Sequence, residues 1–178
     1  WDALGLRGTC SSGYVLETRV PASHILFDGY DDISAQTMLP VSHVLWSSLW
    51  LGLATDAVNR ARAFVRDAAR RKPGTMPPGA VRLAEVVGVL QTMRAGVTDA
   101  AKAFDAIFDD RDALSSMGFA LRMNGLKVQS ATLAVQIVSQ AMSICGIAGY
   151  KADTKYSVER HLRDAYSAGI QINNDRVL

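Results

Sequence analysis

Residues 145–165, CGIAGYKADTKYSVERHLRDA, decide the fold of this chain. A glycine-rich turn follows a long apolar run, and a segment rich in charged side chains comes after the turn. Glycine adopts the positive φ that commonly ends a helix, so Gly146 predicts the C-terminus of one helix. Arg160, Arg163 and Asp164 have helical spacing, which predicts a second helix over about 156–171 and would let Arg160 pair with Asp164.

Hydrophobic periodicity extends this helical pattern upstream. From about Pro40, apolar residues recur at three- and four-residue intervals until a basic run that Pro73-Gly74 ends. The same pattern predicts two further helices, over about 80–108 and about 113–145. Long helices joined by short turns are typical of an up-down four-helix bundle. The expected fold class is therefore mainly α.

The first 30 residues have a different composition. Glycines separate short runs, and the run from Tyr14 to Val20 is β-branched and aromatic with rough alternation, which predicts one or two strands. Because such strands need partners that this chain does not supply, we expect a short β segment that belongs to a truncated β domain. The predicted division is 1–30 for the end of that middle β domain and 31–178 for the C-terminal helical bundle domain. A start at Trp1 without Met fits a piece of a longer protein.

The composition and net charge of the chain exclude several classes of function. The chain has 178 residues, of which 49% are apolar and 20% charged, with a net charge of +2. This composition is globular, and so small a basic excess gives no argument for nucleic-acid binding. Two cysteines are too few for a disulfide framework, which favours a reduced, cytoplasmic setting. No run of about 18 uncharged apolar residues is present, so we expect no membrane span, and no metal site is predicted.

Both ends of the chain resemble the acyl-CoA dehydrogenase family. Residues 143–150 and 156–164 are similar to the family patterns Q-I-x-G-G-x-G-Y and Y-P-V-E-R-x-x-R-D of its C-terminal helical domain. Residues 1–11, WDALGLRGTCS, resemble the family's W-D-x-L-G-M-R-G-T-x-S segment at the end of the middle β domain. The resemblance implies a flavoprotein with FAD as cofactor and an acyl-CoA or acyl-carrier-protein thioester as substrate. It also implies a homodimer or homotetramer that assembles through the helical bundle.

The family's desaturation chemistry needs a base, and the usual one is missing here. In the family a buried glutamate removes a proton next to the thioester carbonyl, and hydride passes from the next carbon to the flavin. The resemblance places that glutamate on Ile172, which cannot accept a proton. Relatives with the base on the first long helix would carry it near Ser42 or His43. The candidate catalytic residues are therefore His43, which titrates near neutrality, and Asp175. A surface or packing role for His43 and a turn role for Asp175 stay open.

The resemblance also implies a set of cofactor-binding residues. The Gly146 turn is similar to the family's loop that approaches the flavin of a neighbouring subunit, with Ser143 in place of the family's glutamine. Arg70 lies in the region of the family's flavin-phosphate arginine, and its guanidinium suits an anionic phosphate. Asn174 and Arg176, from the closing segment, complete the set. A helix C-cap explains Gly146 equally well, and a solvated basic helix end explains Arg70.

Three functions stay open at this point. The first is the C-terminal region of an FAD-dependent acyl-thioester dehydrogenase with a displaced base. The second is a related flavin monooxygenase, in which reduced flavin attacks oxygen and no carboxylate base is needed. The third is a bundle without chemistry that serves as an oligomerisation module or scaffold.

Overall fold

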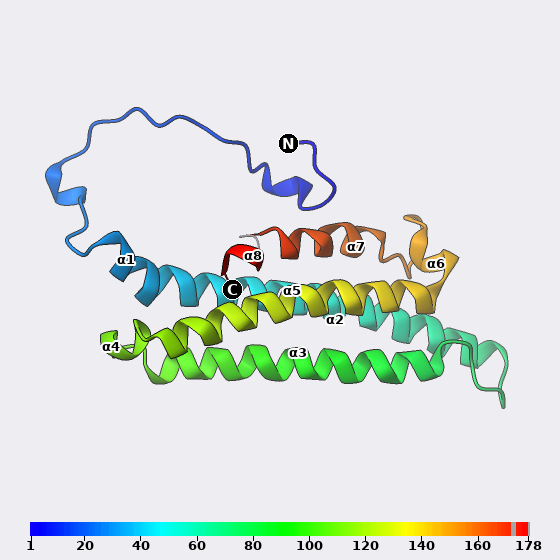
Figure 1. Cartoon of the computed structure of the whole chain (residues 1–178). Helices are drawn as coiled ribbons and strands as arrows, with labels where there is room; N and C mark the ends of the chain where they lie inside the picture. Colours follow the sequence, from blue (N-terminus) through cyan, green and yellow to red (C-terminus); the bar gives the residue numbers. More distant parts are fainter. Residues whose placement is uncertain (172–173, 178) are drawn as a thin grey trace.

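Three long helices lie side by side and form the body of the molecule (Figure 1). The computed structural model describes residues 1–171 and 174–177, with the backbone alone for 176 and 177. The long helices are α2 (Leu39–Arg71), α3 (Ala80–Ala106) and α5 (Met117–Cys145). The chain runs along α2, returns along α3 and runs forward again along α5. A shorter fourth layer, α7 (Glu159–Ala165) with the 3-10 turn η4 (Tyr166–Gly169), covers α2 and α5. The mainly α fold class is thus confirmed.

Local signals in the sequence set the helix ends. The helical run begins with α1 (Tyr30–Ile33) and a π-helical turn (η3, Ser34–Met38), which lead directly into α2. The short α4 (Arg111–Leu114) begins at Asp110, whose carboxylate accepts the Ala113 N–H, and α5 begins at Ser116, whose hydroxyl accepts the Phe119 N–H. At its C-terminus, α5 ends at Gly146, where φ is 56°. The short α6 (Ile147–Tyr150) follows this turn.

Small residues let the central helices approach closely. Ala54, Ala57 and Ala61 of α2 are fully buried, and α5 contributes the buried Ala131, Ala134 and Ala141 to the same core. A second apolar cluster lies where α3 and α5 meet α4; it consists of Val97, Ala100, Leu114, Phe119, Met123 and Leu126. The dense packing of both clusters fixes the bundle, and with it the side chains of the site.

The expected strands at the N-terminus do not form. Within the described part of the chain there is no strand, and residues 12–29 make a wide loop that leaves the bundle and returns to it at α1 (Figure 1). Tyr14, Val15 and Leu16 are more than two-thirds exposed. The strand prediction is wrong for this chain because no neighbouring strand is present to pair with the backbone N–H and C=O groups.

The fourth helix is shorter than expected. It begins at Glu159 instead of about 156, because the Val158 N–H donates to the Gly149 carbonyl at 2.9 Å and so closes the preceding loop. The expected Arg160–Asp164 pair is also wrong. Arg163 instead pairs with Glu159, one turn before it on the same helix, at 2.8 Å. Asp164 binds the N-terminal segment.

Among the described residues, α5 is the one helix whose length and composition would suit a membrane span. The search for about 18 uncharged apolar residues in a row did not find α5, because charged side chains such as Arg122 and Lys127 interrupt its apolar sequence. It packs against both α2 and α3, and its buried face belongs to the bundle core.

Candidate functional site

Polar side chains are buried inside the bundle where α2, α5 and α8 (Asn174–Val177) meet. His43 and Ser47 lie one turn apart on α2, and Lys127 lies on α5; all three are at most 3% exposed. The Lys127 ammonium donates to the side-chain oxygen of Asn174 at 2.7 Å. We call His43, Ser47, Lys127 and Asn174 the polar cluster. It unites one predicted catalytic residue and one predicted cofactor residue.

The hydrogen bonds of His43 assign its tautomer. Its Nδ1 lies 2.7 Å from the Leu39 carbonyl oxygen. A carbonyl only accepts, so in the neutral ring the proton is on Nδ1 and the lone pair is on Nε2. Nε2 is buried without a hydrogen-bond partner among the described residues, and so is the Ser47 hydroxyl. The cluster therefore offers one buried acceptor and one buried hydroxyl to a ligand.

The surroundings of His43 disfavour its protonated form. Burial lowers the pKa of His43, the hydrogen bond to Leu39 raises it, and the positive charge of Lys127 lowers it, with a net decrease. Burial also lowers the pKa of Lys127. His43 is therefore neutral at neutral pH.

Lys127 is the functional candidate that the sequence analysis missed. It lies one turn after Met123 and one turn before Ala131, and both of these residues are buried. The sequence could have indicated this residue, because a lysine stands at a position of the helix where the periodic pattern predicts a buried apolar side chain.

The remaining predicted catalytic residues are not brought into the cluster. Asp175 is exposed on α8 and so lacks the buried setting that the family's base requires. Ile172 and the side chain of Arg176 lie outside the described residues. Of the two candidate catalytic residues, only His43 is buried beside other polar groups.

Three of the other predicted cofactor residues, Arg70, Ser143 and Gly146, lie at the opposite end of the bundle. Arg70 is exposed and lies 3.6 Å from Asp67, and the Ser143 hydroxyl donates to the Ser139 carbonyl of its own helix. Gly146 is exposed and turns the chain. Ser143 is 16 residues after Lys127, or about 24 Å along α5. The two groups of residues are therefore too far apart to form one compact site within this chain.

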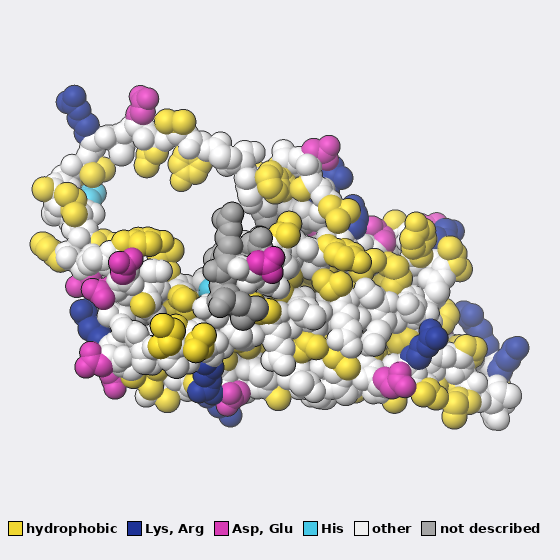
Figure 2. Space-filling model, in the orientation of Figure 1, with side chains coloured by type: hydrophobic (Ala, Val, Ile, Leu, Met, Phe, Trp, Pro, Cys, Tyr) yellow, Lys and Arg dark blue, Asp and Glu magenta, His cyan; other side chains and the backbone are white. Residues whose placement is uncertain are grey.

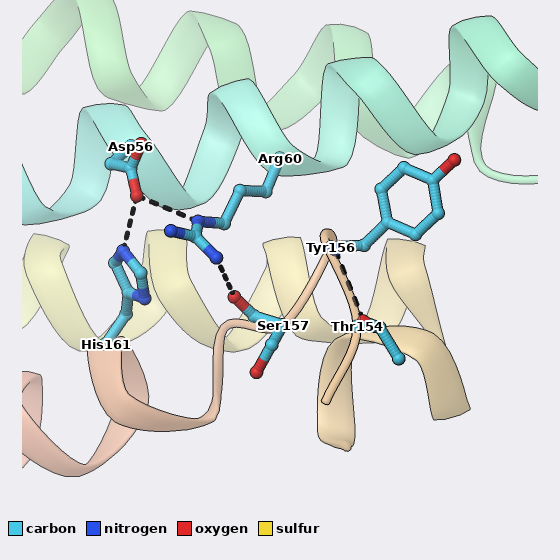
Figure 3. A network of polar contacts seen from close by, with 6 residues as sticks. All are labelled: Asp56, Arg60, Thr154, Tyr156, Ser157 and His161. Carbon is cyan, nitrogen blue, oxygen red and sulfur yellow. Dashed lines mark hydrogen bonds and ion pairs between the residues drawn. The ribbon is translucent and has the colours of Figure 1, made fainter. Parts of the chain in front are cut away.

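The motif at 156–164 mainly holds the C-terminal segment on α2 (Figure 3). Asp56 of α2 accepts from Arg60 at 2.8 Å and lies 2.7 Å from Nε2 of His161 on α7. Arg60 also donates to the Ser157 carbonyl at 2.8 Å. Partial burial raises the pKa of Asp56, but the hydrogen bonds and charges of Arg60 and His161 lower it more. The motif is therefore architectural.

A second set of contacts fastens the preceding loop. Tyr156 donates to Asp67 at 2.6 Å, and Lys155 donates to the same oxygen at 2.8 Å. The hydrogen bonds from Lys155 and Tyr156 lower the pKa of Asp67 to about 2. Thr154 donates to the Ala148 carbonyl. Its hydroxyl also accepts the Tyr156 N–H (Figure 3). These contacts explain the order of a glycine turn, a loop and a charged helix in this chain without assigning chemistry to it.

An apolar cleft of about 490 Å³ lies between the N-terminal segment, α2 and η4. We call it the tryptophan cleft; its apolar lining includes Trp1, Leu4, Trp46, Leu49, Trp50 and Tyr166. The ring of Trp46 lies 5.9 Å from that of His43, so this side chain connects the cleft to the polar cluster. Figure 2 shows the hydrophobic side chains that gather on this side of the molecule.

The N-terminal segment covers this cleft by a specific contact. The Leu6 N–H donates to the Asp164 carboxylate at 2.7 Å, and Gly5 lies directly against the backbone of Arg163. Leu6 adopts a positive φ of 50° there. The contact joins residues 158 positions apart and places residues 1–10 beside α7.

Two other chemistries find no support among the described residues. Burial raises the pKa of the Cys145 thiol to about 11, so this side chain is not an activated nucleophile. No group of three or more His, Cys, Asp or Glu side chains in the described part of the chain has metal-binding geometry.

Comparison with known proteins agrees with this architecture. The family model for the C-terminal domain of acyl-CoA dehydrogenases matches residues 33–171. The chain belongs to the acyl-CoA dehydrogenase family. This family consists of flavoprotein oxidoreductases. Among curated proteins, the chain is similar to a dibenzothiophene monooxygenase from Mycolicibacterium goodii, with 28% identity over 138 residues that cover 70% of this chain and 32% of that protein. The chain thus spans about a third of the length of this relative.

Proposed function

We propose that this chain is the C-terminal helical part of a flavin-dependent monooxygenase of the acyl-CoA dehydrogenase family. One observation carries the proposal: the polar cluster contains two basic side chains, His43 and Lys127, and the buried polar side chains among the described residues include no carboxylate. The similarity to a monooxygenase of the same family supports it.

The electrostatics of the cluster argue against proton abstraction. A desaturase base must keep the proton that it removes from the substrate carbon. If His43 took this proton on Nε2, it would become a second buried cation beside Lys127. Burial and the lysine charge both disfavour that state. Ile172, at the position of the family's glutamate, has no group that accepts a proton.

A monooxygenase reaction does not require these residues to remove a proton from a substrate carbon. Bound reduced flavin supplies two electrons to O₂, so that one oxygen atom enters the substrate and the other leaves as water. In this reaction the neutral His43 offers a fixed acceptor for one hydrogen bond at Nε2, and the apolar side chains around it exclude water. Asn174 would hold the flavin of its own chain, and Gly146 with Arg70 would contact the flavin of a neighbouring subunit. This arrangement requires a homo-oligomer built through the bundle.

The second candidate is the FAD-dependent dehydrogenation of an acyl-CoA or acyl-carrier-protein thioester. The buried lone pair on Nε2 of His43 favours it, because that atom is the one proton acceptor in the polar cluster with a free position. On this alternative His43 is the base and the flavin accepts hydride.

Two assays on the full-length protein separate the candidates. In the first, reduced FAD, ¹⁸O₂ and dibenzothiophene are supplied together, and we expect one ¹⁸O atom in the product by mass spectrometry. In the second, the oxidised flavoprotein is mixed anaerobically with acyl-CoAs of several chain lengths, and we expect no bleaching of the flavin absorbance. Bleaching by a thioester, abolished in His43→Ala, would instead establish the dehydrogenase. A protein that binds no flavin and shows neither reaction would be a scaffold.

A further inference from the structure

We propose that Lys127 is a positioning residue that holds the closing segment of the chain, through Asn174, against α5 beside His43. The proposal concerns a residue without a predicted role, and it assigns the placement of Asn174 to one buried side chain. The proposal does not depend on which reaction the protein catalyses.

The burial of Lys127 indicates that the side chain is retained for more than packing. Lys127 is fully buried in the middle of α5, between apolar turns of the helix that belong to the core. Moving an ammonium group out of water costs several kcal/mol. A methionine has similar length and fills the same space without that penalty. The stable alternative is therefore apolar, and the amine must be explained by what it binds.

The amine binds the closing segment directly. Its Nζ donates to Asn174 Oδ1 at 2.7 Å, across 47 positions of sequence. Asn174 is the first residue of α8 and is half-buried. Asn174 also lies two residues after Ile172, the position of the family's base. Restraint of Asn174 thus restrains the part of the chain that would face the flavin.

The same amine adds to the lowering of the His43 pKa, for which burial is the largest cause. Lys127 faces His43 from α5 and carries the positive charge that acts on it. Among the described residues, the groups that hydrogen-bond to His43, the Leu39 carbonyl and the Ser42 hydroxyl, are neutral. Asp175 is exposed on α8. Removal of the lysine charge would therefore make His43 easier to protonate.

Two substitutions separate these roles in the full-length protein. Lys127→Met removes both the contact and the charge, and Asn174→Ala removes the contact but keeps the charge. Lys102→Met, at an exposed position of α3, is the matched control for a lost lysine. Hydrogen exchange of residues 170–177 and the NMR titration of His43, with labelled histidine, are measured in all four proteins.

We expect exchange in residues 170–177 to become about tenfold faster in Lys127→Met and in Asn174→Ala, as the loss of one hydrogen bond to a charged group predicts. The midpoint of the His43 titration should rise in Lys127→Met alone, and Lys102→Met should change neither quantity. Unchanged exchange in both cluster variants would overturn the proposal, and so would an unchanged His43 titration in Lys127→Met. Since neither readout needs turnover, both would still change if the monooxygenase assignment failed.

Discussion

Gly5 lies against the backbone of α7 at a distance that admits no side chain. A Cβ added there would lie 2.2 Å from the Arg163 carbonyl oxygen, and backbone cannot move aside as a side chain does. The neighbouring hydrogen bond from Leu6 to Asp164 fixes the same contact. One glycine therefore controls how the N-terminal segment joins the bundle.

We expect Gly5→Ala to destabilise this contact by about 1–3 kcal/mol, the usual penalty for overpacking. Gly8→Ala is the matched control, since nothing lies within 4 Å of a Cβ added at Gly8. Hydrogen exchange at the Leu6 amide measures the effect. Equal protection of this amide in both variants would show that the close approach does not exist in solution.

Single residues of the site also differ in burial from what hydrophobic periodicity predicts. On α2, Leu45 and Leu49 are more than half exposed, while His43 and Ser47 are buried. On α5, Lys127 takes a core position. Periodicity predicts that a helix has a buried face, but with a stripe this wide it does not determine which residues form the centre of that face.

At the scale of elements, the loop between α6 and α7 depends on Asp67 of α2. This carboxylate accepts from both Tyr156 and Lys155, which lowers its pKa from 3.8 to about 2. At pH values well above 3.8, Asp67 is ionised in both the folded and the unfolded chain, and its full stabilisation is present. As pH falls from about 4 to about 2, the unfolded chain binds a proton first, and this stabilisation is lost.

We therefore expect Asp67→Asn to be less stable than the original chain at pH 6, with a difference that shrinks between pH 4 and pH 2. Asp153→Asn removes one negative charge from the loop itself and serves as the control. Denaturant unfolding at a series of pH values gives the comparison. A difference that stays constant down to pH 2 would mean that Asp67 does not hold the loop.

At the scale of the whole molecule, the chain consists of a packed bundle and a loop that the bundle does not support. Residues 12–29 are exposed throughout, and both ends of this loop are held, by the Leu6–Asp164 contact and by α1. Exposed backbone without packing is the preferred site of proteolytic cleavage.

Trypsin should consequently cut the 178-residue chain after Arg19 before it cuts within α2, where Arg60 and Arg66 are helical. The helical circular dichroism should persist after this first cut, because the loop contributes nothing to the core. Arg19→Gln should remove the early fragment and leave the later ones. Resistance at Arg19 in the unmodified chain would show that a partner surface covers the loop.

The sequence alone determined the helices and the family. Each helix depends on hydrogen bonds between residues four positions apart, on local caps such as Asp110 and Ser116, and on the stop at Gly146, so a short window of sequence contains the necessary information. The motifs at both ends carried the family assignment for the same reason, since their order and spacing are read directly from the chain.

Only the tertiary structure determined which residues form the polar cluster, how the N-terminal segment contacts α7, and whether the predicted strands form. His43, Lys127 and Asn174 meet because three helices distant in sequence pack together, and Asp164 binds Leu6 instead of its helical neighbour Arg160 for the same reason. Residues 14–20 have strand propensity, but a strand forms only where another strand accepts its hydrogen bonds. Local preference acts within one segment, whereas burial, charge and strand pairing are properties of the contacts between segments.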